Sequence, residues 1–246
     1  MLKFNHLKFR YDPYPVGLAA PLFEADIYAE LLAHFPPLEL FKRRKLGLKY
    51  ALSEGVNRKE YFQFLRGNTI WREFNQWVRS DAFIEHLLKT LKEHSLELPY
   101  IQRPTVQRYL RQVAYSLAGK IDHRCSLRSR FEFSMLPADG GQVIPHTDSP
   151  GKAVTLVLSM AAGDEWEPEW GGGTDINRPR HDRLKFNLMN DKAEFDDMEI
   201  VESYPYRPNQ AVIFLRTYNS WHSVRPMLGS GSKLMRKTLT INVMEP

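Results

Sequence analysis

The sequence predicts a mainly β protein with N-terminal helices, in which a double-stranded β-helix (jelly roll) is buttressed by α-helices. Up to about residue 120 the apolar residues recur at helical spacing, whereas from residue 127 onward they alternate with a period of two in short segments. Clusters of Gly, Pro, Asn and Asp separate these segments. Short strands without helical patterns between them favour antiparallel pairing in a sandwich or barrel.

The chain is expected to form one domain. Its 246 residues contain no repeat, low-complexity run or Ser/Gly linker that would mark a boundary. Sandwiches and barrels commonly reach this length as one unit, and 43% hydrophobic residues supply a sizeable core. We therefore expect a single domain over residues 1–246, with a helical support over about 20–120 and a jelly-roll core over about 125–246.

Three helical regions are expected in the first half of the chain. Residues 29–35 (AELLAHF) place their apolar side chains on one face and stop at Pro36, and residues 69–93 form one broken helix or two consecutive ones. A third helix should follow Pro104 and end at Gly119. Its apolar stripe, which we expect to be buried, consists of Val106, Leu110, Val113 and Leu117.

The second half carries five segments of strand length that alternate apolar and polar residues. They are RFEFSML (130–136), AVTLVLSM (153–160), MEIVESY (198–204), AVIFLRT (211–217) and RKTLTINVM (236–244).

Three residues in this half form a candidate metal site. His146 and Asp148 lie two positions apart at the edge of a strand pattern, so an extended backbone points both side chains to the same side. Taken alone, such a pair is weak evidence, because a surface histidine beside a turn aspartate is common. The candidate third ligand is His222, which follows a strand and a short turn and would come from a different part of the barrel.

Two histidines and one carboxylate on one face of an octahedral iron leave three adjacent positions open for a bidentate cosubstrate and dioxygen. A structural zinc site would fill all four of its positions. Because Cys125 is the only cysteine, it cannot form an internal disulfide or build a cysteine-based site. Any metal must therefore be held by nitrogen and oxygen.

The last strand supplies a candidate anion site. Its polar residues alternate with Leu239, Ile241 and Val243, so they share one face of the strand. If that face points inward, Arg236 can grip a carboxylate through two parallel hydrogen bonds and Thr238 can add a hydroxyl. If it points outward, it is an ordinary solvated surface.

The order of these segments resembles the prolyl-hydroxylase-like branch of the 2-oxoglutarate and iron(II)-dependent oxygenases. The motifs are PHTDS, WGGGTD, NQAVIFL, SWHSVRP and RKTLT, within about residues 125–245. The resemblance implies Fe(II) held by His146, Asp148 and His222, which act as the catalytic centre, and 2-oxoglutarate that chelates the iron while Arg236 binds its distal carboxylate. It also implies that dioxygen decarboxylates the cosubstrate to succinate and CO2 and that a substrate C–H bond is hydroxylated.

Two features depart from the family pattern. Arg236 lies further from His222 than is typical, and Arg225 follows His222 closely, so Arg225 is an alternative ligand for 2-oxoglutarate. The long, charged stretch from residue 177 to 209 looks like an insertion or extended hairpin that could act as a lid.

The substrate is expected to be a small molecule, and a net charge of +5 suits an anionic one, although such a charge is also common in proteins that bind nothing charged. Arg128 and Arg130 alternate with Phe131 and Phe133, which places both arginines on one face leading to the metal. They belong to a basic segment that also contains Arg103, Arg108, Arg111, Lys120 and Arg124.

Several other functions remain open from the sequence. A peptide hydroxylase of the same chemistry, a metal-free jelly-roll binding module and an iron enzyme without 2-oxoglutarate are alternatives, whereas Asp148 argues against a halogenase. We do not expect nucleic acid as a partner. No stretch approaches the roughly 20 apolar residues of a membrane span, and the first residues lack the apolar block of a secretion signal. We therefore expect a cytoplasmic protein without a membrane partner.

Overall fold

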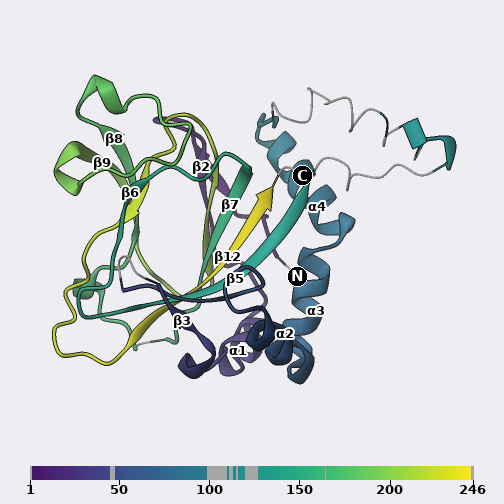
Figure 1. Ribbon diagram of the computed structural model, residues 1–246, viewed down its shortest axis with the longest axis horizontal. Helices are drawn as coiled ribbons and strands as arrows, with labels where there is room; N and C mark the ends of the chain where they lie inside the picture. Colours follow the sequence, from purple (N-terminus) through teal and green to yellow (C-terminus); the bar gives the residue numbers. More distant parts are fainter. Residues whose placement is uncertain are drawn as a thin grey trace.

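Two antiparallel β-sheets form the framework of the protein in a computed structural model, which describes residues 2–44, 48–98, 110, 113–114, 116–119, 127–163 and 165–244 (Figure 1). The large sheet has the order β1 (Lys8–Arg10), β2 (Val16–Ala19), β10 (Gln210–Leu215), β7 (Lys152–Ser159), β12 (Met235–Met244), β5 (Arg128–Pro137), β4 (Tyr50–Ser53) and β3 (Lys42–Arg43). The small sheet has the order β6 (Val143–His146), β11 (His222–Val224), β8 (Thr174–Pro179) and β9 (Met198–Tyr204). This arrangement confirms the predicted jelly roll.

Alternation along the strands decides what each face of the large sheet contacts. Leu239 and Ile241 of β12, together with Phe131 and Phe133 of β5, are buried in the main hydrophobic core. Their neighbours one position away face the small sheet, where Ile176 of β8 packs with apolar residues of β2 and β10. The polar positions of β12 therefore point into the space between the sheets.

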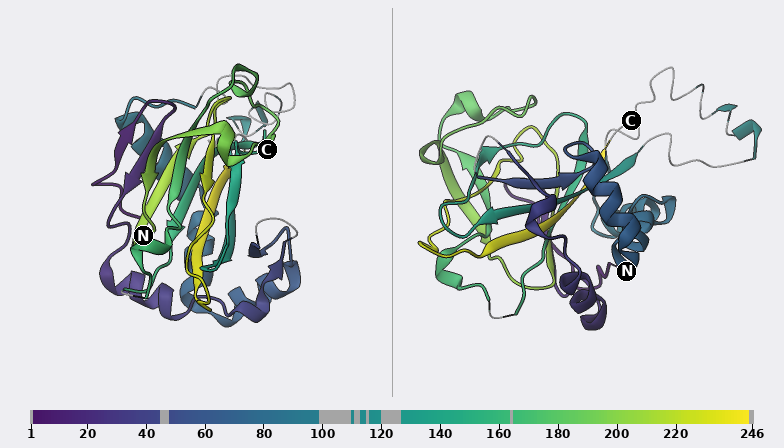
Figure 2. Two further views of the ribbon diagram at one scale, coloured as in Figure 1. Left: turned by 90° about the vertical axis from the view of Figure 1, so that its left-hand side faces the viewer. Right: turned by 60° about the horizontal axis from the view of Figure 1, so that its bottom comes forward.

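Four α-helices cover the outer face of the large sheet (Figures 1 and 2). They are α1 (Ala25–Ala33), α2 (Arg58–Gly67), α3 (Thr69–Val78) and α4 (Asp81–Glu93), and short 3-10 turns occur at Leu38–Leu40, Pro168–Trp170, Asp182–Leu184 and Phe195–Asp197. Trp71 of α3 is fully buried, and its ring lies 4.8 Å from that of Phe133. Burying aromatic surface in this way stabilises the contact between helix and sheet.

All three predicted helical regions contain helix: the described residues of the third, 110, 113–114 and 116–117, are helical, and Gly119 follows them with a positive φ. The segment that stops before Pro36 is α1, and residues 69–93 form two helices, α3 and α4, that are separated where the Ser80 side chain caps the second by accepting from the Phe83 N–H. The prediction missed α2. No helix in the described part of the chain is long and apolar enough to cross a membrane.

The expected burial of the third amphipathic stripe is wrong where it can be checked. Val106 and the basic residues Arg103, Arg108, Arg111, Lys120 and Arg124 lie outside the described residues. Leu110, Val113 and Leu117 are 61%, 38% and 85% exposed. Helical spacing gathers apolar residues on one face of a helix, but it does not specify an element that covers that face.

The first half of the chain also contributes strands that the helical pattern did not predict. Strands β1 to β4 lie at the two ends of the large sheet, and each has only two to four residues. Segments this short contain too few residues for a period of two to be recognised.

Candidate metal centre

The small sheet brings the two histidines together. His146 ends β6 and His222 begins β11, and these residues pair directly in the antiparallel register, so both side chains leave the same face. Asp148 follows His146 by two positions. One ligand atom from each of the three side chains lies within 4.8 Å of the other two, which is the distance range that a shared cation requires. Structure and sequence therefore select the same three residues as a candidate metal site.

Backbone carbonyls fix how the two imidazoles are oriented. Nδ1 of His146 lies 2.9 Å from the Ile144 carbonyl oxygen, and Nδ1 of His222 lies 2.9 Å from that of Ser220. Because a carbonyl oxygen only accepts, each Nδ1 must carry the proton. The lone pair of each neutral ring is then on Nε2, the atom left to bind a metal.

Burial keeps both rings neutral. It lowers the pKa of His146 to about 3, an effect that the nearby His222 reinforces and that Asp148 opposes. Burial likewise lowers the pKa of His222, although Asp148 and the Ser220 carbonyl act in the opposite direction. Neutral imidazole is the form that coordinates a metal.

Asp148 is buried but ionised. Its Oδ1 accepts from Lys152 Nζ and its Oδ2 accepts from the Thr155 hydroxyl, both at 2.5 Å. Burial alone would raise the pKa of Asp148, yet the charge of Lys152, the nearby His222 and these two hydrogen bonds outweigh it and hold the pKa below its usual range. The site therefore presents one anionic and two neutral donors.

A cavity of about 120 Å³ adjoins the three candidate ligands. Arg236 and Thr238 line it from the inner face of β12, as the alternation along that strand requires. Thr238 is 2% exposed, and its hydroxyl lies 2.8 Å from that of Ser134. The polar face of the last strand thus points inward.

Arg236 is a buried cation, with only 4% of its surface exposed. Its Nε donates to the Gly172 carbonyl at 2.5 Å, and its guanidinium carbon lies 5.1 Å from the centre of the Tyr206 ring. Burial lowers the pKa of Arg236 to about 10, and the nearby Tyr206 and Asp175 oppose that shift. Arg236 makes no ion pair with a carboxylate of the described residues. The two terminal nitrogens therefore remain to bind an anion in the cavity.

Arg225, the alternative arginine, lies elsewhere. Its side chain is 57% exposed and pairs with the buried Asp175, with Nε 2.9 Å from Oδ2. It lines a different cavity, on the other side of the small sheet from the metal candidates. The two arginines that the sequence left open are therefore clearly separated in the structure.

The stretch from residue 177 to 209 contacts the candidate metal loop. It contains the end of β8, two 3-10 turns and all of β9. The Thr147 hydroxyl donates to the Asn187 carbonyl at 3.0 Å, and the Arg216 side chain donates both to the Asp148 carbonyl at 2.9 Å and to the Leu188 carbonyl. These contacts fix the segment beside the site, and its role as a lid stays a prediction.

Sequence reasoning missed the residues that hold Asp148. Thr155 is a polar residue within an otherwise apolar strand, which is a signal that could have been noticed. Lys152 lies four positions after Asp148, but no regular element relates the two in the sequence. Arg216 is 68 positions away from Asp148, and no pattern in the chain links them.

A sequence model of the family described as the 2OG-Fe(II) oxygenase superfamily matches residues 131–244. No match was found among curated proteins.

Among solved structures, the chain is similar to a prolyl-4-hydroxylase of Pseudomonas putida, with 15% identity, a TM-score of 0.46 and coverage of 94% of this chain and 92% of that one. It is also similar to a prolyl hydroxylase of Trichoplax adhaerens in complex with a hypoxia inducible factor peptide, with 12% identity, a TM-score of 0.48 and coverage of 94% and 83%. A third is the non-heme α-ketoglutarate-dependent epimerase SnoN from nogalamycin biosynthesis, with 15% identity, a TM-score of 0.43 and coverage of 93% and 76%.

Proposed function

Because the chain belongs to the 2OG-Fe(II) oxygenase superfamily, whose sequence model covers every candidate site residue, we propose that His146, Asp148 and His222 hold Fe(II) and that Arg236 and Thr238 bind 2-oxoglutarate. Enzymes of this superfamily use Fe(II), 2-oxoglutarate and dioxygen. A metal-free binding module is therefore no longer a competing interpretation.

The residues present fit both groups. Two neutral imidazoles with free Nε2 atoms and one ionised carboxylate are the donors of a facial iron site. A buried guanidinium without an ion-pair partner lines the same cavity and would be neutralised by a carboxylate of the cosubstrate. This shared cavity is the observation that carries the proposal.

When bound, the iron and the cosubstrate supply oxidising power, because the decarboxylation of 2-oxoglutarate to succinate and CO2 is coupled to hydroxylation of a substrate C–H bond. The chain orients these reactants. Carbonyls of Ile144 and Ser220 hold the two imidazoles in the required tautomer, and Thr155 orients Asp148. Arg236, held by the Gly172 carbonyl, would bind the distal carboxylate of 2-oxoglutarate.

We further infer that the prime substrate is an anionic small molecule. Lys49 and Lys152 line the cavity, and each is partly neutralised by a carboxylate, Lys49 by Glu132 at 2.7 Å and Lys152 by Asp148 at 2.5 Å. Arg130 of β5 lies opposite Asn242 of β12 in the register of the large sheet, and Asn242 lies opposite Thr155 of β7. Two strand spacings amount to about 10 Å, so the backbone of Arg130 lies about that far from the backbone of Thr155, whose hydroxyl donates to Asp148.

The exposed side chains of Arg128 and Arg130 support the same inference, because an anion approaching from this side meets positive charge before it reaches the metal. Phosphorylated and nucleotide-linked small molecules match this charge. A neutral peptide would gain nothing from it.

Succinate release tests the proposal. The protein is incubated with Fe(II), 2-oxoglutarate and panels of phosphorylated compounds, nucleotide-linked compounds and neutral prolyl peptides. We expect Fe(II)-dependent succinate that rises with an anionic compound. Stimulation by peptides alone would overturn the substrate class but leave the chemistry intact, whereas succinate formation that does not require Fe(II) would overturn the chemistry.

A further inference from the structure

A second cavity is separate from the candidate metal centre. It has a volume of about 1030 Å³, and no described residue lines both this cavity and the one beside the three metal candidates. Its walls come from the segments before β8, between β9 and β10, and after β11. These segments meet at the end of the barrel where β12 begins. At the other end, Asp148 lies in the connection before β7 and His222 begins β11. The proposed oxygenase chemistry does not use this cavity.

Three aromatic rings form a corner in this cavity. The Trp166 ring lies 5.4 Å from that of Trp170 at an interplanar angle of 82°, and 5.0 Å from that of Tyr206 at 78°. The arrangement is fixed by polar contacts, because Trp166 Nε1 donates to the Gly171 carbonyl at 2.9 Å and the Tyr206 hydroxyl donates to the Lys237 carbonyl at 2.8 Å. Perpendicular rings held in this way expose π faces in two directions without any rearrangement.

One of these rings already binds a cation within the chain. The Arg236 guanidinium lies over Tyr206, and Tyr206 is 7% exposed. Trp166 and Trp170 have no such partner among the described cations and are only partly buried. The two tryptophans are therefore the faces that remain for a ligand.

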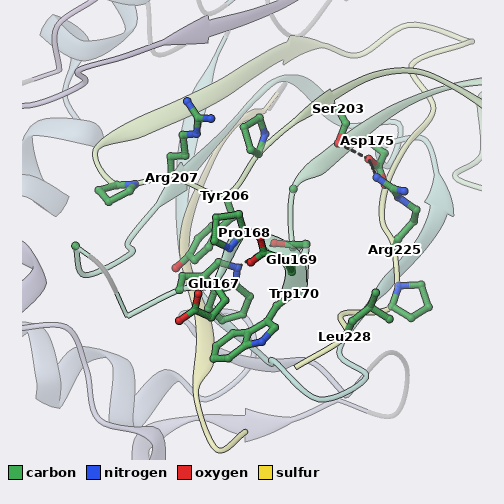
Figure 3. Close-up of a pocket in the computed structure, with 18 of the residues that line it drawn as sticks. Glu167, Pro168, Glu169, Trp170, Asp175, Ser203, Tyr206, Arg207, Arg225 and Leu228 are labelled. Carbon is green, nitrogen blue, oxygen red and sulfur yellow. Dashed lines mark hydrogen bonds and ion pairs between the residues drawn. The ribbon is translucent and has the colours of Figure 1, made fainter. Parts of the chain in front are cut away.

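Two carboxylates stand beside the tryptophans. In the sequence WEPEW, Glu167 and Glu169 flank Pro168 and the two tryptophans flank the glutamates, and a 3-10 turn spans Pro168–Trp170. Both glutamates are exposed and line the cavity, and neither forms an ion pair within the described part of the chain. Figure 3 shows Glu167, Glu169, Tyr206 and Trp170 close together in the middle of the cavity.

The two arginines of the cavity do not neutralise these carboxylates. Arg225 is turned toward Asp175, which also accepts from the Ser203 hydroxyl at 2.7 Å. Arg207 extends away from Trp170 (Figure 3). Glu167 and Glu169 therefore lie without an ion pair among the described residues beside the two tryptophans, while the Arg236 guanidinium lies over Tyr206.

We propose that this aromatic corner is a second binding site, specific for an organic cation such as a quaternary ammonium group. Aromatic faces attract a cation through their quadrupole, and the two unpaired carboxylates add a charge interaction that a neutral ligand of equal size cannot use. Apolar methyl groups on the cation would also be covered by the tryptophan surface and by Pro168.

Choline and its neutral isostere 3,3-dimethylbutan-1-ol are the probes, since they differ in charge but hardly in shape. Binding to the full chain is followed by tryptophan fluorescence and by calorimetry. We expect saturable binding of choline and binding of the alcohol that is weaker by at least about threefold. Equal affinities for the two probes, or no saturable binding of choline, would overturn the proposal.

Variants locate the binding. Trp170→Ala and Glu169→Gln should each weaken choline binding by about threefold or more, with melting temperatures confirming that both variants fold. Glu39→Gln is the matched control, because Glu39 is also an exposed glutamate in a 3-10 turn that follows a proline. Choline affinity that is unchanged in Trp170→Ala and Glu169→Gln, or lowered equally in Glu39→Gln, would show that the corner is not the site.

Discussion

Replacement of Arg236 by methionine should raise the KM for 2-oxoglutarate while leaving Fe(II) binding unchanged. Methionine keeps much of the volume but removes the charge and all donors. In the wild type, Nε donates to the Gly172 carbonyl, so the two terminal nitrogens are left to bind 2-oxoglutarate. The methionine variant lacks these two donors.

The magnitude follows from the burial of Arg236, which is 4% exposed. Losing one partner of a buried, hydrogen-bonded charge pair costs about 2–5 kcal/mol. At 1.4 kcal/mol for each factor of ten, the KM should rise between about 30-fold and several thousand-fold. Arg236→Lys, which keeps the charge but loses the planar fork, should fall between the wild type and Arg236→Met.

The assay is succinate formation at varied 2-oxoglutarate with saturating Fe(II), and Arg225→Gln is the control. Arg225 pairs with Asp175, which is 1% exposed, so its removal should lower the melting temperature but leave the KM unaltered. A raised KM in Arg225→Gln together with a normal KM in Arg236→Met would refute the reasoning and select the other arginine.

Three further predictions concern the same region. Between about pH 6.5 and 3, His146 is protonated in the unfolded chain but not in the folded chain, because burial lowers its pKa to about 3. The free energy of unfolding of the metal-free protein should therefore fall as the pH falls through this window. Urea titrations at pH 7 and 5 measure this loss of stability, and His146→Gln should make the loss smaller. The KM of an anionic substrate, measured at saturating 2-oxoglutarate, should rise with salt, and a KM that does not change with salt would exclude an anionic substrate. Gly172→Ala should lower the free energy of unfolding by about 1–3 kcal/mol, because Gly172 has φ of +80°; urea titration measures this effect. The same variant should raise the KM for 2-oxoglutarate, because the added Cβ would lie 3.2 Å from Arg236 Cδ; initial rates measure that KM.

The alternation of β12 was readable from the sequence, and it placed Arg236 and Thr238 on one face of that strand. Whether this face points inward could not be read from β12 alone, because the answer depends on its neighbours. Strands β5 and β7 pair with β12 and place Leu239 and Ile241 against the helices, which turns Arg236 toward the small sheet.

The three candidate ligands were selected by residue type and motif order, but their convergence depends on long-range pairing. His222 lies opposite His146 only because β11 and β6 are neighbours in the small sheet. Local spacing accounts for His146 and Asp148, since an extended chain repeats every second residue. It contains no information about Arg216, which reaches the Asp148 carbonyl from the end of a strand in the other sheet.

The large cavity shows the limit of reading motifs by themselves. The glycine-rich WGGGTD segment entered the sequence analysis only as a family motif, and in the structure its Gly172 takes a positive φ next to Arg236. The preceding WEPEW segment contained the aromatic and acidic residues of the corner, but its meaning depends on Tyr206, which a different connection supplies.

Bound Fe(II) and 2-oxoglutarate-dependent succinate formation, measured side by side in the wild type and in Asp148→Ala, test whether Asp148 is a ligand of a catalytic iron. Removing the only anionic donor from a three-ligand site should weaken metal binding and abolish turnover together. The account predicts stoichiometric Fe(II) and succinate for the wild type and neither for the variant. Undiminished succinate formation by Asp148→Ala, at the same metal content as the wild type, would contradict it.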